Sequence, residues 1–229
     1  MEFFEAVRAR RSIRKYTDKE VPESVIQNAL DAALLAPNSS NMQTWGFYWV
    51  KTPEKKEKLI KACLSQGAAR TAKELIVVTA EPRRWKRNRV EMIKRMKEAN
   101  SPSFMFPYYE KLIPIMYGFQ ILAPLKWLLF NAVGIFKPLM RRPWSPRDRA
   151  EVSIKSATLA CENFMLAITA QGFATCPMEG FDEWRVKRLL GLGFSDRVAM
   201  VISVGEPDLE RGIWGPQIRF DRNWFVHPV

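Results

Sequence analysis

The feature of this sequence that most constrains its fold is the wide spacing of its strand-like segments. Trp45 to Val50 is aromatic and β-branched, while Leu75 to Ala80 and Val198 to Val204 are apolar enough to lie inside a sheet. Long stretches with helical patterns separate these three segments. Helices mixed with strands that are far apart in sequence predict an α+β or α/β layer architecture.

Apolar residues at helical spacing indicate several helices between and around these strands. The expected helices are one around Phe3 to Val7, one that begins at Pro22 and ends before Pro37, and three over Lys55 to Leu64, Arg149 to Gln171 and Asp182 to Leu190. Gly172 and Gly191 are the expected C-terminal stops of the last two helices. A chain of 229 residues, 47% of them hydrophobic, can bury one sizeable core, so residues 1–229 are expected to form one domain.

The segment from about 102 to 144 is expected to be an apolar insertion in that domain. Leu112 to Leu125 has no charge over 14 residues and Trp127 to Phe136 has none over 10. Both are shorter than the roughly 20 apolar residues of a spanning helix. Prolines should also interrupt any longer helix; they are Pro107, Pro114, Pro124 and Pro138.

Three interpretations of this insertion are open. A lid packed on a partner subunit is the first choice, because apolar stripes are usually buried. Basic residues beside the apolar segments would also suit an anionic membrane surface; they are Lys126, Lys137, Arg141 and Arg142. Finally, aromatic residues could wall a pocket for an aromatic or quinone-like molecule; they are Phe104, Phe106, Tyr108, Tyr109, Tyr117, Phe119, Trp127 and Phe130.

The formal charge of +12 favours anionic ligands, anionic membranes or nucleic acid. Nucleic acid is the weakest of these, because the basic residues are spread along the chain without a recognisable binding module. The three cysteines form no CxxC pair, so neither a disulfide framework nor a zinc site is expected. Together with the lack of a visible secretory signal, they predict a reducing, cytoplasmic environment.

Four polar motifs are candidates for ligand binding. Arg10, Arg11 and Arg14, with Ser12 between them, offer several guanidinium forks that suit a phosphate dianion, although the spacing alone favours a solvated basic turn. Asn38 to Trp45 could hydrogen-bond a ligand or form a plain loop. The stretch Cys176 to Asp182 predicts a rigid loop that could turn backbone N–H groups toward a planar ligand, or simply lead into the next helix. The fourth motif surrounds Arg219, which says little by itself.

Taken in order, these motifs resemble those of the nitroreductase family of flavoproteins. RRSIRKY resembles the family's opening arginine-rich motif, APNSSNMQTW its Ser/Asn/Gln loop, CPMEGFD its flavin-facing loop, and RFDRNWFVH its basic tail. The likeness covers residues 1 to about 80 and 148 to 229. It implies the nitroreductase-like fold: a mostly antiparallel central sheet flanked by helices, in a homodimer with an apolar lid insertion.

The resemblance also implies which residues bind flavin mononucleotide (FMN). Arg10, Ser12, Arg14 and Arg219 would hold the phosphate, and Arg11 would pass beside the flavin. Asn38, Ser39, Asn41 and Gln43 match the loop that closes over the flavin from the partner subunit, and Gln66 is the candidate for the pyrimidine edge. Pro177, Met178, Glu179 and Gly180 match the loop against the ring, with the Glu179 N–H toward flavin N5.

Because the flavin carries the chemistry, no side chain is expected as a catalytic acid, base or nucleophile. The expected activity is a ping-pong oxidoreductase that takes hydride from NADH or NADPH and reduces a nitroaromatic, quinone or similar acceptor. A flavin-dependent dehalogenase and a flavin-degrading enzyme are the enzymatic alternatives. A non-catalytic flavin-binding or membrane-associated protein is the alternative from another class.

Overall fold

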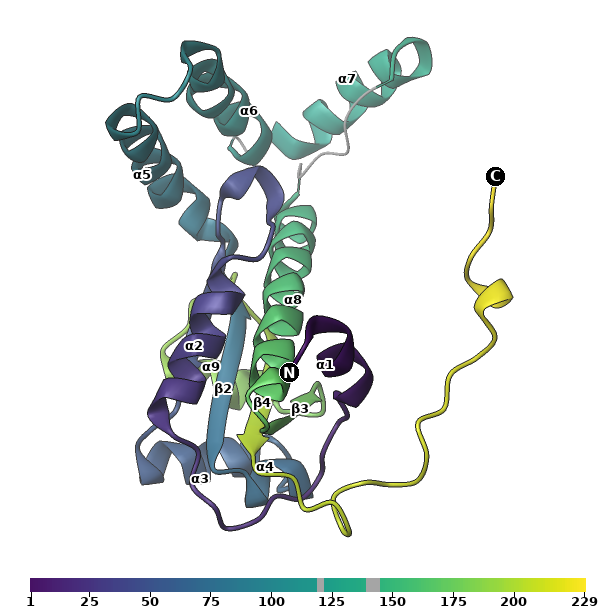
Figure 1. The fold of residues 1–229 in the computed structure, drawn as a ribbon. Helices are drawn as coiled ribbons and strands as arrows, with labels where there is room; N and C mark the ends of the chain where they lie inside the picture. The colour runs from purple at the N-terminus through teal and green to yellow at the C-terminus, as the bar shows by residue number, and fades with distance from the viewer. Residues whose placement is uncertain (119–121, 139–144) are drawn as a thin grey trace.

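The chain folds around a four-stranded sheet in the part that the computed structural model describes, residues 1–118, 122–138 and 145–229 (Figure 1). The strands are β1 (Trp45–Trp49), β2 (Glu74–Ala80), β3 (Ala174–Met178) and β4 (Arg197–Gly205). Their order is β1-β2-β4-β3, and every pair is antiparallel. The prediction of a largely antiparallel central sheet is therefore confirmed, as are the three strands that the sequence indicated.

Strand β3 corrects the prediction of a loop from Cys176 to Asp182. Cys176, Pro177 and Met178 are the last residues of this edge strand, and Pro177 lies opposite Ile202 of β4. Proline is tolerated there because an edge strand can leave one side of its backbone unpaired. The loop is confined to the residues between Met178 and the helix that begins at Glu183.

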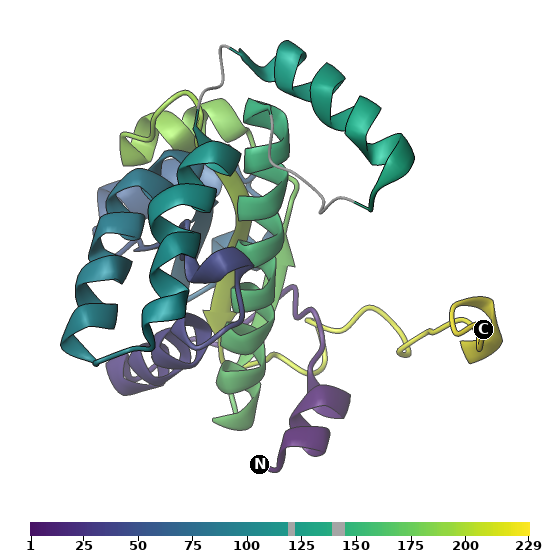
Figure 2. The same cartoon turned by 90° about the horizontal axis from the view of Figure 1, so that it is seen from above.

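Helices cover both faces of the sheet, and side chains alternate between the two faces along β2. Leu75 and Val77 belong to one core cluster, packed against α3 (Pro53–Ala62), α4 (Gly67–Thr71) and α9 (Glu183–Leu190). Ile76 and Val78 belong to the other, packed against α2 (Glu23–Leu34) and α8 (Pro146–Ala170). The period of two along an extended strand produces this three-layer arrangement, which Figure 2 shows from above.

The predicted helices are confirmed, and local signals explain where they begin and end. Helix α8 starts at Ser145, whose side chain accepts from the Asp148 N–H in a reciprocal capping box. Gly172 follows its end with φ +82°, and α9 ends at Gly191 with φ +66°, both in the left-handed region. The first helix, α1 (Phe3–Ala9), packs beside α8.

The segment after β2 forms a helical extension with a small core of its own. It contains α5 (Trp85–Glu98), α6 (Ile113–Tyr117) and α7 (Ala123–Phe136), together with short helical turns at Pro82–Arg84, Ser103–Met105 and Tyr108–Leu112. Trp85, Met96, Ile113 and Met116 pack into the small core beneath α5 and α6. The prediction that prolines interrupt the helices is wrong for Pro114, because the helical turn Tyr108–Leu112 runs directly into α6, whose first turn contains this proline. Pro124 lies in the first turn of α7.

The idea that eight aromatic residues wall one pocket is wrong for this chain. Tyr109 and Tyr117 are buried in the small core, whereas the side chains of Phe104 and Trp127 are exposed. Phe119 lies outside the described residues. Among the described helices, none has the length and apolar character needed to cross a bilayer.

Candidate functional site

The backbone of the arginine segment is fixed to the sheet at both ends. Ser12 pairs with Thr175 of β3, and the Ile13 N–H donates to the Thr175 carbonyl at 3.0 Å. At the other end, the buried Tyr16 hydroxyl lies 2.9 Å from the Ser203 hydroxyl of β4. Burial raises the pKa of Tyr16 well above its usual range, so the hydroxyl stays protonated and neutral. The guanidinium groups between these anchors are thus carried on a backbone that the core holds in place.

The three guanidinium groups are half-buried, and nearby carboxylates neutralise little of their positive charge. Arg10 has only a loose contact with Glu162, at 3.9 Å. Arg11 donates to the Gly215 carbonyl at 2.7 Å. Arg14 lies over the ring of Trp214, with its guanidinium carbon 4.5 Å from the ring centroid. Half-buried cations without a close carboxylate favour an anionic ligand, and the planar forks suit the oxygens of a phosphate.

The positive charges of this segment also influence the pKa of a cysteine in strand β3. Burial raises the pKa of the Cys176 thiol, and the positive charges of Arg14 and Arg10 oppose that rise. Two of the guanidinium groups therefore act electrostatically on the strand that leads into the predicted ring-facing turn.

Gln66 and Gly67 connect the arginine segment with that turn. The Gln66 amide donates to the Gly180 carbonyl at 3.0 Å and to the Cys63 carbonyl at 3.1 Å. A Cβ on Gly67 would lie only 2.9 Å from the Arg14 carbonyl oxygen, so the two backbones approach closely. Arg14, Gln66 and Gly180, which are far apart in sequence, are thus brought into one neighbourhood.

In the motif predicted to face the flavin ring, the exposure of each side chain indicates whether the side chain or only the backbone can contact a ligand. Met178 is buried in the core beneath β3, so only its backbone could meet a ligand. Glu179 and Gly180 are exposed, and Pro177 is half-buried at the sheet edge. Met178 can therefore offer a ligand only its backbone, while Pro177 and Glu179 can also offer their side chains.

The loop with Asn38, Ser39, Asn41 and Gln43 is held by its own polar groups. Asn38 accepts from the Gln43 N–H at 2.8 Å, and the Gln43 amide donates to Asn41 at 3.2 Å. The Ser39 N–H donates to Ser156 of α8 at 3.4 Å. Asn41 and Gln43 have φ near +50°, in the left-handed region that asparagine tolerates best among non-glycine residues.

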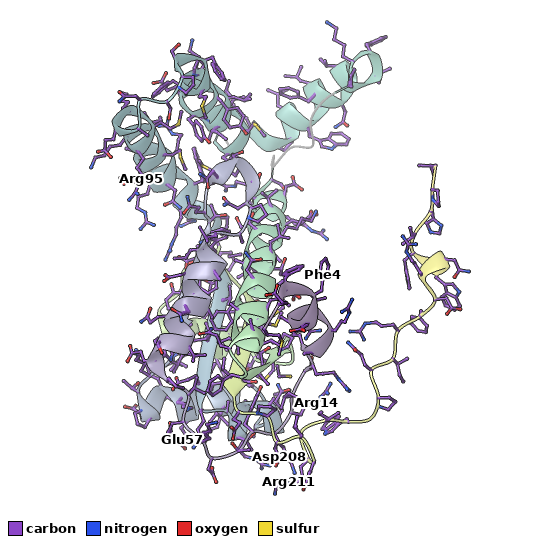
Figure 3. All side chains as sticks on the ribbon, in the orientation of Figure 1. Phe4, Arg14, Glu57, Arg95, Asp208 and Arg211 are labelled. Carbon is purple, nitrogen blue, oxygen red and sulfur yellow. The ribbon has the colours of Figure 1, made fainter. Side chains whose placement is uncertain are left out.

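This loop borders a different part of the chain from the arginine segment. Asn41 and Gln43 line a cleft of about 780 Å³ together with Arg84, Asn88 and Arg95. Figure 3 shows Arg95 and Arg14 toward opposite ends of the molecule. Among the described residues, no hydrogen bond or ion pair joins the loop to the arginine segment. One chain thus holds two separate halves of the predicted flavin site.

Arg219 is also not brought to the arginine segment within one chain. It lies on the C-terminal stretch, which runs away from the body (Figures 1 and 2), and its guanidinium donates to the neighbouring Ile218 carbonyl. The same stretch exposes large apolar side chains; they are Trp214, Ile218, Phe220, Trp224 and Phe225.

Three residues of this neighbourhood were missed by the sequence interpretation. Trp214 stacks on Arg14, and the Gly212 carbonyl accepts from the Arg14 N–H at 2.9 Å. A Cβ on Gly212 would lie 2.6 Å from the Lys15 carbonyl oxygen. This close approach of two backbones resembles the one between Gly67 and the Arg14 carbonyl oxygen. The available signal was the clustering of Gly212, Trp214 and Gly215 shortly after the last strand, a place where glycine allows close backbone approach.

Comparison with known proteins identifies the family of this chain. The model of the nitroreductase family matches residues 7–206. The chain belongs to the nitroreductase family. The match spans the arginine segment, the Asn38 loop, Gln66 and the turn after β3, so every predicted site residue except Arg219 lies inside it.

Individual relatives extend over nearly the whole of this nitroreductase-family chain. Protein DrgA of Synechocystis is 26% identical over 207 residues, which cover 90% of this chain and 84% of that protein. The NADH dehydrogenase of Thermus thermophilus is 25% identical over 198 residues, covering 86% and 83%. A protein of Exiguobacterium sibiricum, solved in complex with FMN, has the same fold with a TM-score of 0.73 at 20% identity, covering 100% of this chain and 98% of that one.

Proposed function

We propose that this nitroreductase-family chain binds FMN and catalyses electron transfer from NADH or NADPH to a nitroaromatic, quinone or similar small acceptor. The observation that carries the proposal is that Arg10, Arg11 and Arg14 are half-buried beside β3, with no closer carboxylate among the described residues than Glu162 at 3.9 Å. A phosphate dianion is the ligand that compensates such a group best. The related protein solved with FMN and the relative called NADH dehydrogenase support the choice of cofactor and electron donor.

Each predicted residue has a defined role in this proposal. Arg10, Ser12 and Arg14 bind the phosphate, and Arg11 lies beside the flavin. Gln66 borders the pyrimidine edge and holds the ring-facing turn in place through the hydrogen bond that its amide donates to the Gly180 carbonyl. Backbone groups of Pro177, Met178, Glu179 and Gly180 face the ring. When bound, FMN supplies two-electron chemistry, so the protein's residues bind and orient the reactants, which enter one after the other in a ping-pong cycle.

We further propose that residues 1–229 act as one FMN-binding domain and that two copies complete each site. Asn38, Ser39, Asn41, Gln43 and Arg219 would then come from the partner subunit. Two observations support this: the loop lies apart from the arginine segment in one chain, and the C-terminal stretch exposes apolar side chains that a partner would cover.

The visible spectrum of the purified protein tests the cofactor, and anaerobic reduction tests the activity. We expect flavin absorbance with about one FMN per chain, bleached within the mixing time of a stopped-flow instrument by NADH or NADPH. Re-oxidation by a quinone or a nitroaromatic should restore the absorbance. A protein that takes up no FMN contradicts the whole proposal, whereas bound FMN that stays oxidised with both nicotinamides contradicts only the reductase activity.

A further inference from the structure

Helix α7 (Ala123–Phe136) exposes large apolar side chains around much of its circumference. Trp127 is 60% exposed, Ile135 78% and Phe136 84%, and the side chains of Leu125, Leu128, Leu129 and Val133 are also exposed. A helix with apolar residues on most of its faces is normally buried inside a protein or a membrane. In water this helix would present an unusually large apolar surface.

The described part of the chain does not provide that burial. Helix α7 projects away from the sheet and its covering helices in two views at right angles (Figures 1 and 2). Among the described residues it has no extensive packing with another helix or strand, unlike α2 and α8, which pack along each other. Within the part of the chain that the structure describes, the apolar surface of α7 is thus left without a covering element.

The charges around α7 indicate what kind of surface could bury its apolar side chains. The sequence from Lys111 to Arg147 contains no aspartate or glutamate, but it contains six basic residues; they are Lys111, Lys126, Lys137, Arg141, Arg142 and Arg147. Arg141 and Arg142 lie outside the described residues, so they enter the argument by sequence alone. Apolar side chains within an exclusively basic segment match a surface that offers both hydrocarbon and negative charge.

The length of α7 defines how it could meet such a surface. Its 14 residues extend about 21 Å at 1.5 Å per residue, which is shorter than the roughly 30 Å hydrocarbon core of a bilayer. The helix can lie in the interfacial region, with its apolar side chains among the acyl chains and its flanking cations among the headgroups.

We propose that α7 docks this protein onto an anionic lipid bilayer by inserting its apolar side chains into the interfacial region. This inference goes beyond the proposed electron transfer and does not depend on FMN. A second copy of the chain is the less favourable partner for α7, because each copy has a formal charge of +12 and the sequence around α7 contains only basic charges. Lipid phosphates instead neutralise those cations.

Co-sedimentation of the full chain with vesicles tests the proposal. We expect binding to sucrose-loaded vesicles of equal parts phosphatidylglycerol and phosphatidylcholine, and at least tenfold weaker binding to phosphatidylcholine alone. The double substitution Trp127→Glu with Ile135→Glu should weaken binding to the mixed vesicles at least tenfold. These two residues are eight positions apart on α7, so they lie close to one face.

A matched control separates insertion from a simple change in net charge. Trp184→Glu with Val90→Glu replaces one tryptophan and one aliphatic residue that are similarly exposed, at 65% and 60%, on other helices of the molecule. This control should bind the mixed vesicles nearly as the wild type does. Because all four side chains are exposed, thermal unfolding midpoints should stay within a few degrees of the wild type, which checks that both variants fold.

Three results would overturn the proposal. Wild-type protein that stays in the supernatant with the mixed vesicles excludes docking. Equal loss of binding by the two double variants shows that net charge, not α7, governs adsorption. A change in oligomeric state by light scattering, found only in the α7 variant, assigns the helix to an interface between copies of the chain.

Discussion

At the scale of single residues, Arg14 is the side chain on which the proposed phosphate site depends most. Its guanidinium lies on the Trp214 ring, its backbone N–H donates to Gly212, and no carboxylate among the described residues forms a salt bridge with it. The guanidinium is thus oriented by neutral groups that leave its charge available. The spacing of the three arginines alone favoured a solvated basic turn, and only the family resemblance pointed to a phosphate at this segment.

The substitution Arg14→Ala should weaken FMN binding about 10- to 100-fold, since hydrogen bonds to a charged group contribute about 1.5–3 kcal/mol. Titration of the apoprotein with FMN, followed by flavin fluorescence, measures the dissociation constant. Lys15→Ala is the matched control: it removes an adjacent, exposed positive charge and should change the constant by less than about threefold. Equal effects of the two substitutions would mean that the segment attracts FMN by general charge only.

Cys161, buried in α8, should contribute a measurable alkaline sensitivity. Burial, assisted by Glu162, raises the pKa of its thiol to about 12, compared with about 8.5 for an unfolded cysteine. The folded state therefore disfavours the thiolate. Its contribution to stability is complete below pH 8.5 and is lost as the pH rises toward 12, by at most about 1.4 kcal/mol per pH unit.

Urea unfolding of the wild type and of Cys161→Ala between pH 7 and pH 11 checks this behaviour. The variant should be less stable at pH 7 because it loses buried volume, and the difference between the two proteins should shrink above pH 9. Tyrosine and lysine ionisation affects both proteins alike and cancels in the comparison. A difference that is constant over the whole range would show that the folded thiol ionises as easily as the unfolded one.

At the scale of elements, the predicted helices carried local chemical signals at their ends, whereas helices α4, α5, α6 and α7 and strand β3 were not predicted. Pro22, Gly172 and Gly191 marked helix ends within a few residues. Strand β3 carried no comparable signal: it is short, and Pro177 argued against it. Its strand conformation depends on pairing with β4, which is set by residues more than twenty positions away.

The end of α9 offers a clean test of one such local signal. Gly191 has φ +66°, and a Cβ there would meet no atom within 4 Å, so a substitution changes only backbone strain. Gly191→Ala should lower the free energy of unfolding by about 1 kcal/mol, and Gly191→Asn by less, because asparagine tolerates the left-handed region better. Chemical unfolding monitored by circular dichroism gives both values, and equal losses would argue against strain as the cause.

At the scale of the whole molecule, the family resemblance implied that the loop from Asn38 comes from the partner subunit, but no pattern in the residues themselves placed the two parts of the site. According to the resemblance the motifs of the site bind one ligand, but in one chain they lie in two places. Arg14 and Gly180 are close together, whereas Asn41 lies on the loop beside the cleft that Arg95 lines. The direction in which α7 projects was equally unpredictable. Both properties depend on long-range packing, which no local pattern encodes.

If each FMN site is shared between two subunits, two variants with substitutions in different parts of the site should form one intact site in a mixed dimer. Each homodimer of Arg14→Ala chains has two defective phosphate sites, and each homodimer of the Asn41→Ala, Gln43→Ala variant has two defective loops. In a mixed dimer, one site combines both defects, while the other combines an intact arginine segment with an intact loop. If each site lies within a single chain, mixing the two variants cannot produce any intact site.

Co-expression of the two variants with different affinity tags allows the mixed dimer to be purified through both tags. We expect this dimer to retain one tightly bound FMN per two chains and about half of the wild-type reductase activity, although neither variant alone retains either property. Light scattering confirms that the purified species contains two chains. Mixed dimers with no tight FMN would mean that each chain's own loop completes its own site, so that the sites are not shared between subunits.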